Sequence, residues 1–193
     1  MQTKLLALTY SAWSEAQFSQ ILYTPNIFSD TEINDILKVK KSGITAGWKR
    51  LVKISINKVN ASNSEKINKR KELDTYIDKY IFKQSQIRNK IAHGQWINAI
   101  ESTEQRTNDF NQRLQSLNVV DIMIEFQVHT HLGKILRDLV QSPNNGFSQN
   151  YNTNINNLKD FLAKSATWNI SSKINQLSKK PKKLFCQNCQ NLV

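Results

Sequence analysis

The chain has few of the residues that end regular secondary structure or cross-link a fold. Its 193 residues include 5 glycines, 3 prolines and 2 cysteines. A β-sandwich or barrel needs a turn about every ten residues, and those turns use glycine and proline, so this composition excludes a turn-rich β protein and favours helices. Two cysteines, both near the C-terminus, are too few for a disulfide framework, which fits a reducing compartment.

The chain also has no long apolar run. No stretch approaches the roughly 18 uninterrupted apolar residues of a membrane span. The short apolar stretch within residues 1–10 is soon followed by polar residues, so it does not have the pattern of a secretory signal peptide. We therefore expect a cytoplasmic protein that has no membrane partner.

Acidic residues are in the minority. Lysine and arginine together number 27 against 15 for aspartate and glutamate, which gives a net charge of +12. This balance indicates an anionic partner, and nucleic acid is the first candidate. A hydrophobic content of 39% is sufficient for a core, and the length excludes a large multidomain protein.

Apolar residues recur at helical spacing along most of the chain. They predict helices over 5–23, 62–94, 118–140 and 152–163. Gly43 and Gly47 interrupt the pattern between Ser29 and Val52, which predicts either one weakened helix or two short ones, and we favour two. Ser29 with Glu32 has the spacing of a capping box, which is repeated at position 62, and Gly94 is placed to end the long helix. We expect an all-α domain over 1–170, followed by a basic, poorly ordered, cysteine-containing tail over 171–193.

The segment 86–96, at the end of the predicted long helix, contains the most informative residues. Arg88, Asn89 and His93 fall at roughly 0°, 100° and 140° around a helix axis, so they share one side. Asn89 and His93 are four residues apart, close enough for the amide to orient the imidazole. Ile87 and Ile91 are expected to hold the adjacent face in the core.

This trio suits cleavage of a phosphodiester next to a ribose 2′-hydroxyl. An imidazole near its ordinary pKa can take the 2′ proton or protonate the leaving 5′ oxygen, and a guanidinium can hold the phosphate, so no metal is needed. One histidine cannot easily serve both sides of one phosphate. The chemistry therefore predicts a homodimer that has this helix at its interface. The alternative is that Arg88 and His93 lie on a solvated face and His93 only stabilises the helix end.

The motif resembles that of a known family. Arg88-Asn89-x-x-x-His93, within RNKIAHG, is similar to the Arg-Asn-x-x-x-His pattern of HEPN-domain proteins, which are all-helical bundles found in prokaryotic toxin and antiphage systems. The resemblance extends over most of residues 5–163. It includes an early aromatic helix with Trp13, the Gly47-Trp48 segment and Gln95-Trp96.

The resemblance implies a HEPN-like helical bundle that dimerises through the motif-bearing helix. It implies metal-independent endoribonuclease activity without a cofactor, from a composite dimer site in which Arg88 and His93 are catalytic and Asn89 positions them. An antitoxin or sensor protein would be a further partner. Some members of the family are inactive RNA-binding or scaffold proteins, and this is the alternative function.

Other residues have two interpretations each. Glu15 could pair with Arg88 or His93, or lie exposed on a polar stripe. Trp96 could stack on an unpaired base, or anchor its loop in the core. Cations at positions 49, 50, 53 and 90 could bind RNA or form solvated faces; they are Lys49, Arg50, Lys53 and Lys90.

Cys186 and Cys189 have the spacing of half a zinc site. His129 and His131 are expected on divergent helix faces and cannot complete that site locally. Two tails in a dimer could complete it, but free thiols at the chain end are the simpler interpretation, and we expect no metal. A helical DNA-binding regulator is a third possible function, but no recognition helix after a tight turn is evident.

Overall fold

The structure, a computed structural model, describes residues 2–94, 111–112 and 114–180. All regular elements in these ranges are helical, which confirms the all-α prediction. The helices in the described ranges include α1 (Gln2–Leu22), α2 (Asp30–Lys40), α3 (Ile44–Asn57), α4 (Asn63–Tyr76), η1 (Ile77–Phe82), α5 (Lys83–Ala92), α7 (Val119–Gln141), η2 (Pro143–Phe147), α8 (Ser148–Ser165) and α9 (Ile170–Ser178). None of these helices combines the length and apolar character that a membrane span needs.

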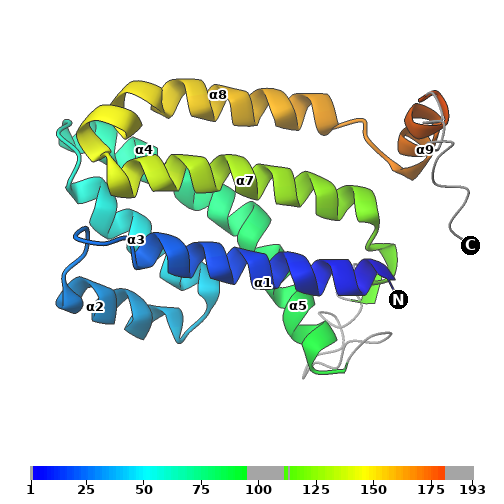
Figure 1. Cartoon of the computed structure of the whole chain (residues 1–193), viewed down its shortest axis with the longest axis horizontal. Helices are drawn as coiled ribbons and strands as arrows, with labels where there is room; N and C mark the ends of the chain where they lie inside the picture. Colours follow the sequence, from blue (N-terminus) through cyan, green and yellow to red (C-terminus); the bar gives the residue numbers. More distant parts are fainter. Residues whose placement is uncertain (1, 95–110, 113, 181–193) are drawn as a thin grey trace, which may run out of the picture.

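Helix α7 is the central element of the bundle. Figure 1 shows α8, α7 and α1 side by side, with α3, α4 and α5 crossing behind them. Leu132 and Leu136 of α7 are fully buried in the main core, together with Phe18 of α1 and Trp48 of α3. A helix that packs against neighbours on several sides buries most of its surface, and α7 accordingly contributes more buried residues than any other described helix.

The helix ends largely follow the expectation from the sequence. The Ser29 hydroxyl accepts a hydrogen bond from the Glu32 N–H at 3.2 Å, and Glu32 Oε2 accepts one from the Ser29 N–H at 2.9 Å. The favoured prediction of two short helices is confirmed, because α2 ends at Lys40 and α3 begins at Ile44. Gly47, the other expected interruption, lies within α3 and is buried. Gly94 follows α5 with a φ of 78°, a left-handed conformation that glycine adopts at little cost.

Two stretches differ from the predicted helices. The expected long helix 62–94 is interrupted by η1, a π-helical turn that allows Ile77, Tyr80 and Ile81 all to reach the core. The helix expected over 152–163 begins earlier, at Ser148, directly after η2. Here the Ser142 hydroxyl accepts a hydrogen bond from the Gly146 N–H at 3.0 Å and Phe147 is buried, so the chain turns without a loop.

The C-terminal region also differs from the prediction of a poorly ordered tail beginning at 171. Helix α9 occupies Ile170–Ser178 and is capped by Asn169, whose side chain accepts a hydrogen bond from the Ser172 N–H at 2.8 Å. Its apolar residues Ile170, Ile174 and Leu177 are exposed. The cap supplies local stability that the lysine-rich composition of this region did not indicate.

Candidate functional site

The Arg-Asn-x-x-x-His motif lies at the C-terminal end of α5. Ile87 and Ile91 are buried in a small cluster that includes Ala7 and Tyr10 of α1 and Ile122 of α7. The expectation that these isoleucines hold α5 in the core is therefore confirmed. Their burial directs the other side of α5 to the surface, which is where the motif residues lie.

Two polar contacts hold the Arg88 side chain. Its Nη1 donates a hydrogen bond to Asn89 Oδ1 at 3.0 Å, and its Nη2 lies 3.6 Å from Glu15 Oε1 of α1. The side chains of Arg88 and Glu15 remain 40% and 39% exposed. Glu15 thus contacts Arg88, one of the two interpretations given for it. The guanidinium is oriented by its neighbours and still accessible to an anion.

Asn89 differs from its expected contact. The hydrogen bond observed for its side chain is with Arg88, whereas the helical spacing suggested that it would orient His93. Adjacent positions on a helix diverge by roughly 100°, so only a long, bent side chain such as arginine can reach back to its neighbour. The Asn89 amide therefore orients the Arg88 guanidinium, which is the group predicted to hold the phosphate.

His93 is the residue that closes α5. Its backbone N–H donates to the Asn89 carbonyl at 3.1 Å, and Gly94 then turns the chain away. The imidazole is exposed. A histidine at a helix end that is open to solvent can exchange protons with water and with a bound substrate.

Two of the predicted RNA-binding cations, Lys49 and Arg50, form ion pairs beside two cavities. Lys49 Nζ is 2.5 Å from Asp78 Oδ2, and Arg50 Nη2 is 2.5 Å from Asp35 Oδ2. Lys49 and Asn89 line one cavity of about 460 Å³, so the structure brings these two together. Arg50 lines the adjoining cavity of about 450 Å³.

The second cavity is rich in basic side chains. Lys49, Arg50, Lys53 and Arg70 line it together with Asp74. Burial raises the pKa of the Asp74 carboxyl, although nearby Lys49 and Arg70 act in the opposite direction.

The structure gives less detail on the other predicted site residues. Lys90 is partly exposed on α5 and has a polar partner. Trp96, Cys186 and Cys189 lie outside the described residues. Within the described ranges, no group of three or more histidine, cysteine, aspartate or glutamate side chains could hold a metal ion.

Sequence reasoning missed the environment of His129. This residue of α7 is 1% exposed, and its Nδ1 lies 3.2 Å from the Tyr10 hydroxyl. The centroid of its ring lies 4.9 Å from the ring centroid of Trp13 and 5.8 Å from that of Trp48. Burial lowers the pKa of His129 to about 3, so the imidazole is neutral. His129 lies three residues after Phe126 and three residues before Leu132, and this helical spacing could have placed it on the same apolar face.

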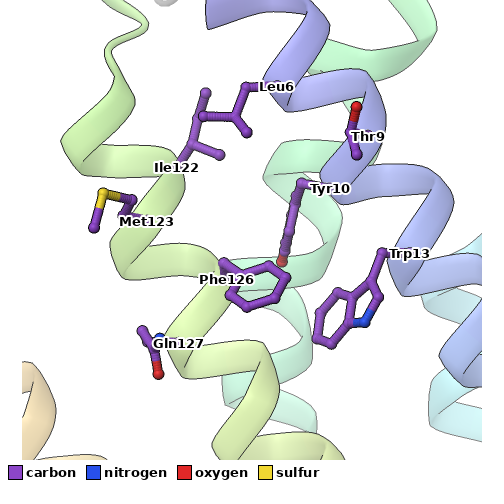
Figure 2. A pocket seen from close by; sticks show the side chains of 8 residues that line it. All are labelled: Leu6, Thr9, Tyr10, Trp13, Ile122, Met123, Phe126 and Gln127. Atoms are coloured by element: carbon purple, nitrogen blue, oxygen red, sulfur yellow. The ribbon is translucent and has the colours of Figure 1, made fainter. Parts of the chain in front are cut away.

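An apolar groove runs between α1 and α7. Figure 2 shows the Tyr10, Trp13 and Phe126 side chains between the two helices. The groove has a volume of about 400 Å³, and Leu6, Thr9, Ile122, Met123 and Gln127 complete its lining. It contains none of the motif residues, so it is separate from the candidate site.

Comparison with family models, curated proteins and solved structures finds no match for this chain.

Proposed function

We propose that this chain is a metal-independent endoribonuclease of the HEPN type. The observation that carries the proposal is the arrangement on α5, where Arg88 is oriented by Asn89 and Glu15 and remains accessible, and where His93 is exposed at the end of the same helix. The net charge of +12 would attract RNA to this surface. The site is built from the side chains alone and needs no cofactor.

In the proposed reaction, Arg88 binds the non-bridging oxygens of the scissile phosphate and offsets the charge that grows on them. A neutral His93 takes the proton from the 2′-hydroxyl, the 2′ oxygen forms a bond to phosphorus, and the bond from phosphorus to the 5′ oxygen breaks. The 5′ oxygen receives a proton from a second imidazole, which is charged. The products are a 2′,3′-cyclic phosphate and a free 5′-hydroxyl.

The base and the acid stand on opposite sides of the phosphorus, so two imidazoles are needed. We propose that the second comes from another copy of the chain, in a homodimer that places two α5 ends together. Solvent exchange restores both histidines to their starting protonation states. Such an enzyme would act in the cytoplasm as a toxin or antiphage nuclease, restrained by an antitoxin or sensor protein.

One observation favours a second candidate function. Because Arg88 already contacts Asn89 and Glu15, a phosphate must compete with the carboxylate for the guanidinium. If Glu15 keeps its contact with Arg88 when RNA binds, the protein is an inactive RNA-binding or scaffold protein of the same fold. This alternative retains RNA binding and lacks cleavage.

Cleavage of total RNA in excess EDTA tests the proposal. Wild-type protein should produce fragments that end in 2′,3′-cyclic phosphates, and His93→Ala should lower the rate by about 10²–10⁴-fold, the usual contribution of a general acid or base. His131→Ala, which changes a histidine outside the site, is the matched control and should cleave at the wild-type rate. If the wild type binds RNA and leaves it intact, the scaffold function replaces the enzymatic one.

A further inference from the structure

Three cavities on one face of the bundle join into a continuous surface along α7. Helices α1, α7 and α8 lie side by side on this face (Figure 1). The first cavity is the apolar groove between α1 and α7. Two cavities of about 320 Å³ each follow it toward the C-terminal end of α7, one on the α1 side and one on the α8 side. Adjacent cavities share lining residues, which are Trp13, Gln127, Thr130 and Arg137.

The lining of this surface changes from apolar to basic along α7. The groove contains Met123 and Phe126, which are 44% and 37% exposed. The two cavities beyond it contain the cations Lys134 and Arg137 together with amide and hydroxyl side chains, which include Gln17, Gln20, Gln127, Thr130, Asn154 and Asn157. In the described part of the chain, no acidic side chain lines any of the three cavities. The surface therefore offers apolar, hydrogen-bonding and cationic groups to one extended ligand.

The two cations of this surface have no carboxylate partner. Lys134 and Arg137 form no ion pair within the described ranges, in contrast to Lys49 and Arg50, which are paired with aspartates. They lie three residues apart on one helix face, where like charges repel each other. A ligand with two or more negative charges would relieve this repulsion, and phosphates bind both side chains well.

The acidic residues of α7 are held by other side chains. Each of the three accepts a hydrogen bond from an amide group: Asp121 from Asn118, Glu125 from Gln84 of α5, and Asp138 from Asn154. None of them lines the three cavities. The charge of the surface is therefore set by Lys134 and Arg137.

Two aromatic rings lie where the groove meets the basic part of the surface. The ring centroids of Trp13 and Phe126 are 4.4 Å apart, and both rings line the groove (Figure 2). Trp13 is partly exposed and also lines the cavity that contains Arg137. Aromatic rings that solvent can reach are stacking surfaces for unpaired bases. The groove has a volume of about 400 Å³, within the range of about 300–1,000 Å³ for small-ligand sites.

We propose that this surface, which we call the α7 platform and define by Trp13, Phe126, Gln127, Lys134 and Arg137, binds a single-stranded part of the RNA substrate outside the cleavage site. Lys134 and Arg137 bind phosphates of the strand, and a base stacks against the two rings. A duplex covers the faces of its bases, so the ligand is single-stranded. The choice of RNA rests on the proposed function.

The platform contains none of the motif residues. Glu15, which contacts Arg88, and Ala16, which lines the α1 side of the platform, are adjacent on α1 and diverge by about 100°. Changes on the platform therefore alter binding of the strand without touching the catalytic groups. His131 lines the α8 side, but its ring packs beside Phe161 with the centroids 5.7 Å apart, so we assign it no contact with RNA.

Removal of the two cations is the first test. The probe is a fluorescent single-stranded RNA of roughly 12 nucleotides with 2′-O-methyl groups throughout, which cannot undergo the proposed attack. The double variant Lys134→Gln/Arg137→Gln should weaken its binding by about tenfold or more at low salt. It should also reduce the slope of log K against log salt concentration by about 1.4, the value for two phosphate contacts on a single strand.

A second double variant is the matched control for charge. Lys38→Gln/Lys41→Gln removes the same charge from two exposed lysines on and directly after α2, outside the three cavities. It should weaken binding by less than about threefold, because only the overall field changes. Thermal unfolding by circular dichroism checks that both double variants fold.

Phe126→Leu tests the stacking, because it keeps an apolar side chain in the groove and removes the ring. It should weaken binding of the probe by about three- to tenfold, and binding of an abasic strand of the same length by less than about twofold. Tyr23→Leu changes a ring that is 57% exposed just after α1 and outside the platform, and it should bind both strands as the wild type does.

Three results would overturn the inference. They are a wild-type chain that does not bind the probe, a Lys134→Gln/Arg137→Gln variant that binds it as tightly as Lys38→Gln/Lys41→Gln does, and equal losses of Phe126→Leu on the two strands.

Failure of the inference and failure of the proposed function give different results. With unmodified RNA, Lys134→Gln/Arg137→Gln should raise KM by about tenfold and change kcat by less than about twofold, whereas His93→Ala lowers kcat and binds the probe as the wild type does. If the wild type does not cleave but the two double variants still differ in binding, the nuclease proposal fails and the platform stands. If the wild type cleaves and His93→Ala does not, while Lys134→Gln/Arg137→Gln binds and cleaves as the wild type does, the nuclease stands and the platform is wrong.

Discussion

His93 and His129 place the same side chain in opposite surroundings. His93 is exposed at the end of α5, whereas His129 lies among Tyr10, Trp13 and Trp48. Burial lowers the pKa of His129 to about 3, so that ring cannot carry a proton near neutral pH, while water and substrate can reach His93. The difference teaches that the environment, and not the residue type, decides which histidine is available for acid–base chemistry.

The largest expected effect is a difference in the free energy of unfolding between variants of the two histidines. His129→Ala removes a ring from the aromatic cluster and leaves the Tyr10 hydroxyl without its partner. It should lower the free energy of unfolding by about 2–4 kcal/mol, whereas His93→Ala should change it by less than about 0.5 kcal/mol. Urea denaturation at pH 7 measures both. Equal losses for the two variants would contradict the comparison.

Acid should destabilise the protein through His129. Its pKa in the folded chain, about 3, lies below the ordinary value of 6.5, so the unfolded chain binds more protons between these values. Stability should therefore fall as the pH falls below about 6.5, by up to about 1.4 kcal/mol per pH unit from this group.

Unfolding by urea between pH 7 and pH 5 measures this dependence. His129→Phe keeps an aromatic ring and should flatten the curve. Burial and Lys134 also lower the pKa of His131, which lies beside Phe161, but His131 is only partly buried, so His131→Gln should flatten the curve less than His129→Phe does. If wild type and His129→Phe lose stability in parallel, His129 is not the source.

A smaller effect tests the close approach of α1 and α7 that encloses His129. A Cβ at Gly133, one turn beyond His129, would lie 2.5 Å from Gln17 Nε2 and 2.6 Å from its Oε1. Gly133→Ala should lower the free energy of unfolding by about 1–2 kcal/mol, because a buried side chain must move. In a Gln17→Ala background the same change should cost much less, and thermal melts of the four proteins would measure the coupling.

The smallest effect concerns the support of the exposed site. Glu15→Gln removes a partly exposed ion pair 3.6 Å long, and such pairs contribute about 0–1 kcal/mol. The RNA cleavage rate kcat/KM should therefore change by less than about fivefold. Glu65→Gln, which breaks an ion pair with Lys69 on α4, is the control and should leave cleavage unchanged. A loss as large as that of His93→Ala would show that Glu15 takes part in the reaction.

The sequence predicted those features that depend on local spacing. The capping box at Ser29 and the end of α5 at Gly94 are written in neighbouring residues, and both were found. The π-helical turn η1 was missed because Ile77, Tyr80 and Ile81 fit an uninterrupted helical stripe as well. The early start of α8 was missed because residues 148–150 are polar and only their position after a buried Phe147 fixes them.

The candidate site shows the same limit. Its position on the surface followed from the burial of Ile87 and Ile91, which the periodicity predicts. The partners of Lys49 and Arg50 could not be predicted, because Asp78 and Asp35 lie on other helices and meet them only through the tertiary fold. His129 was missed for a related reason: its burial depends on α1 packing against α7.

The contact between Tyr10 and His129 joins residues that are 119 positions apart. During synthesis at about 5–20 residues per second, α1 leaves the ribosome roughly 6–24 seconds before its partner surface on α7 exists. The helices α7 and α8, which are joined directly through η2, can pair as soon as they emerge. The side of the first helix that faces α7 therefore stays uncovered until α7 emerges, whereas its contacts with α3 and α5 can form earlier in synthesis.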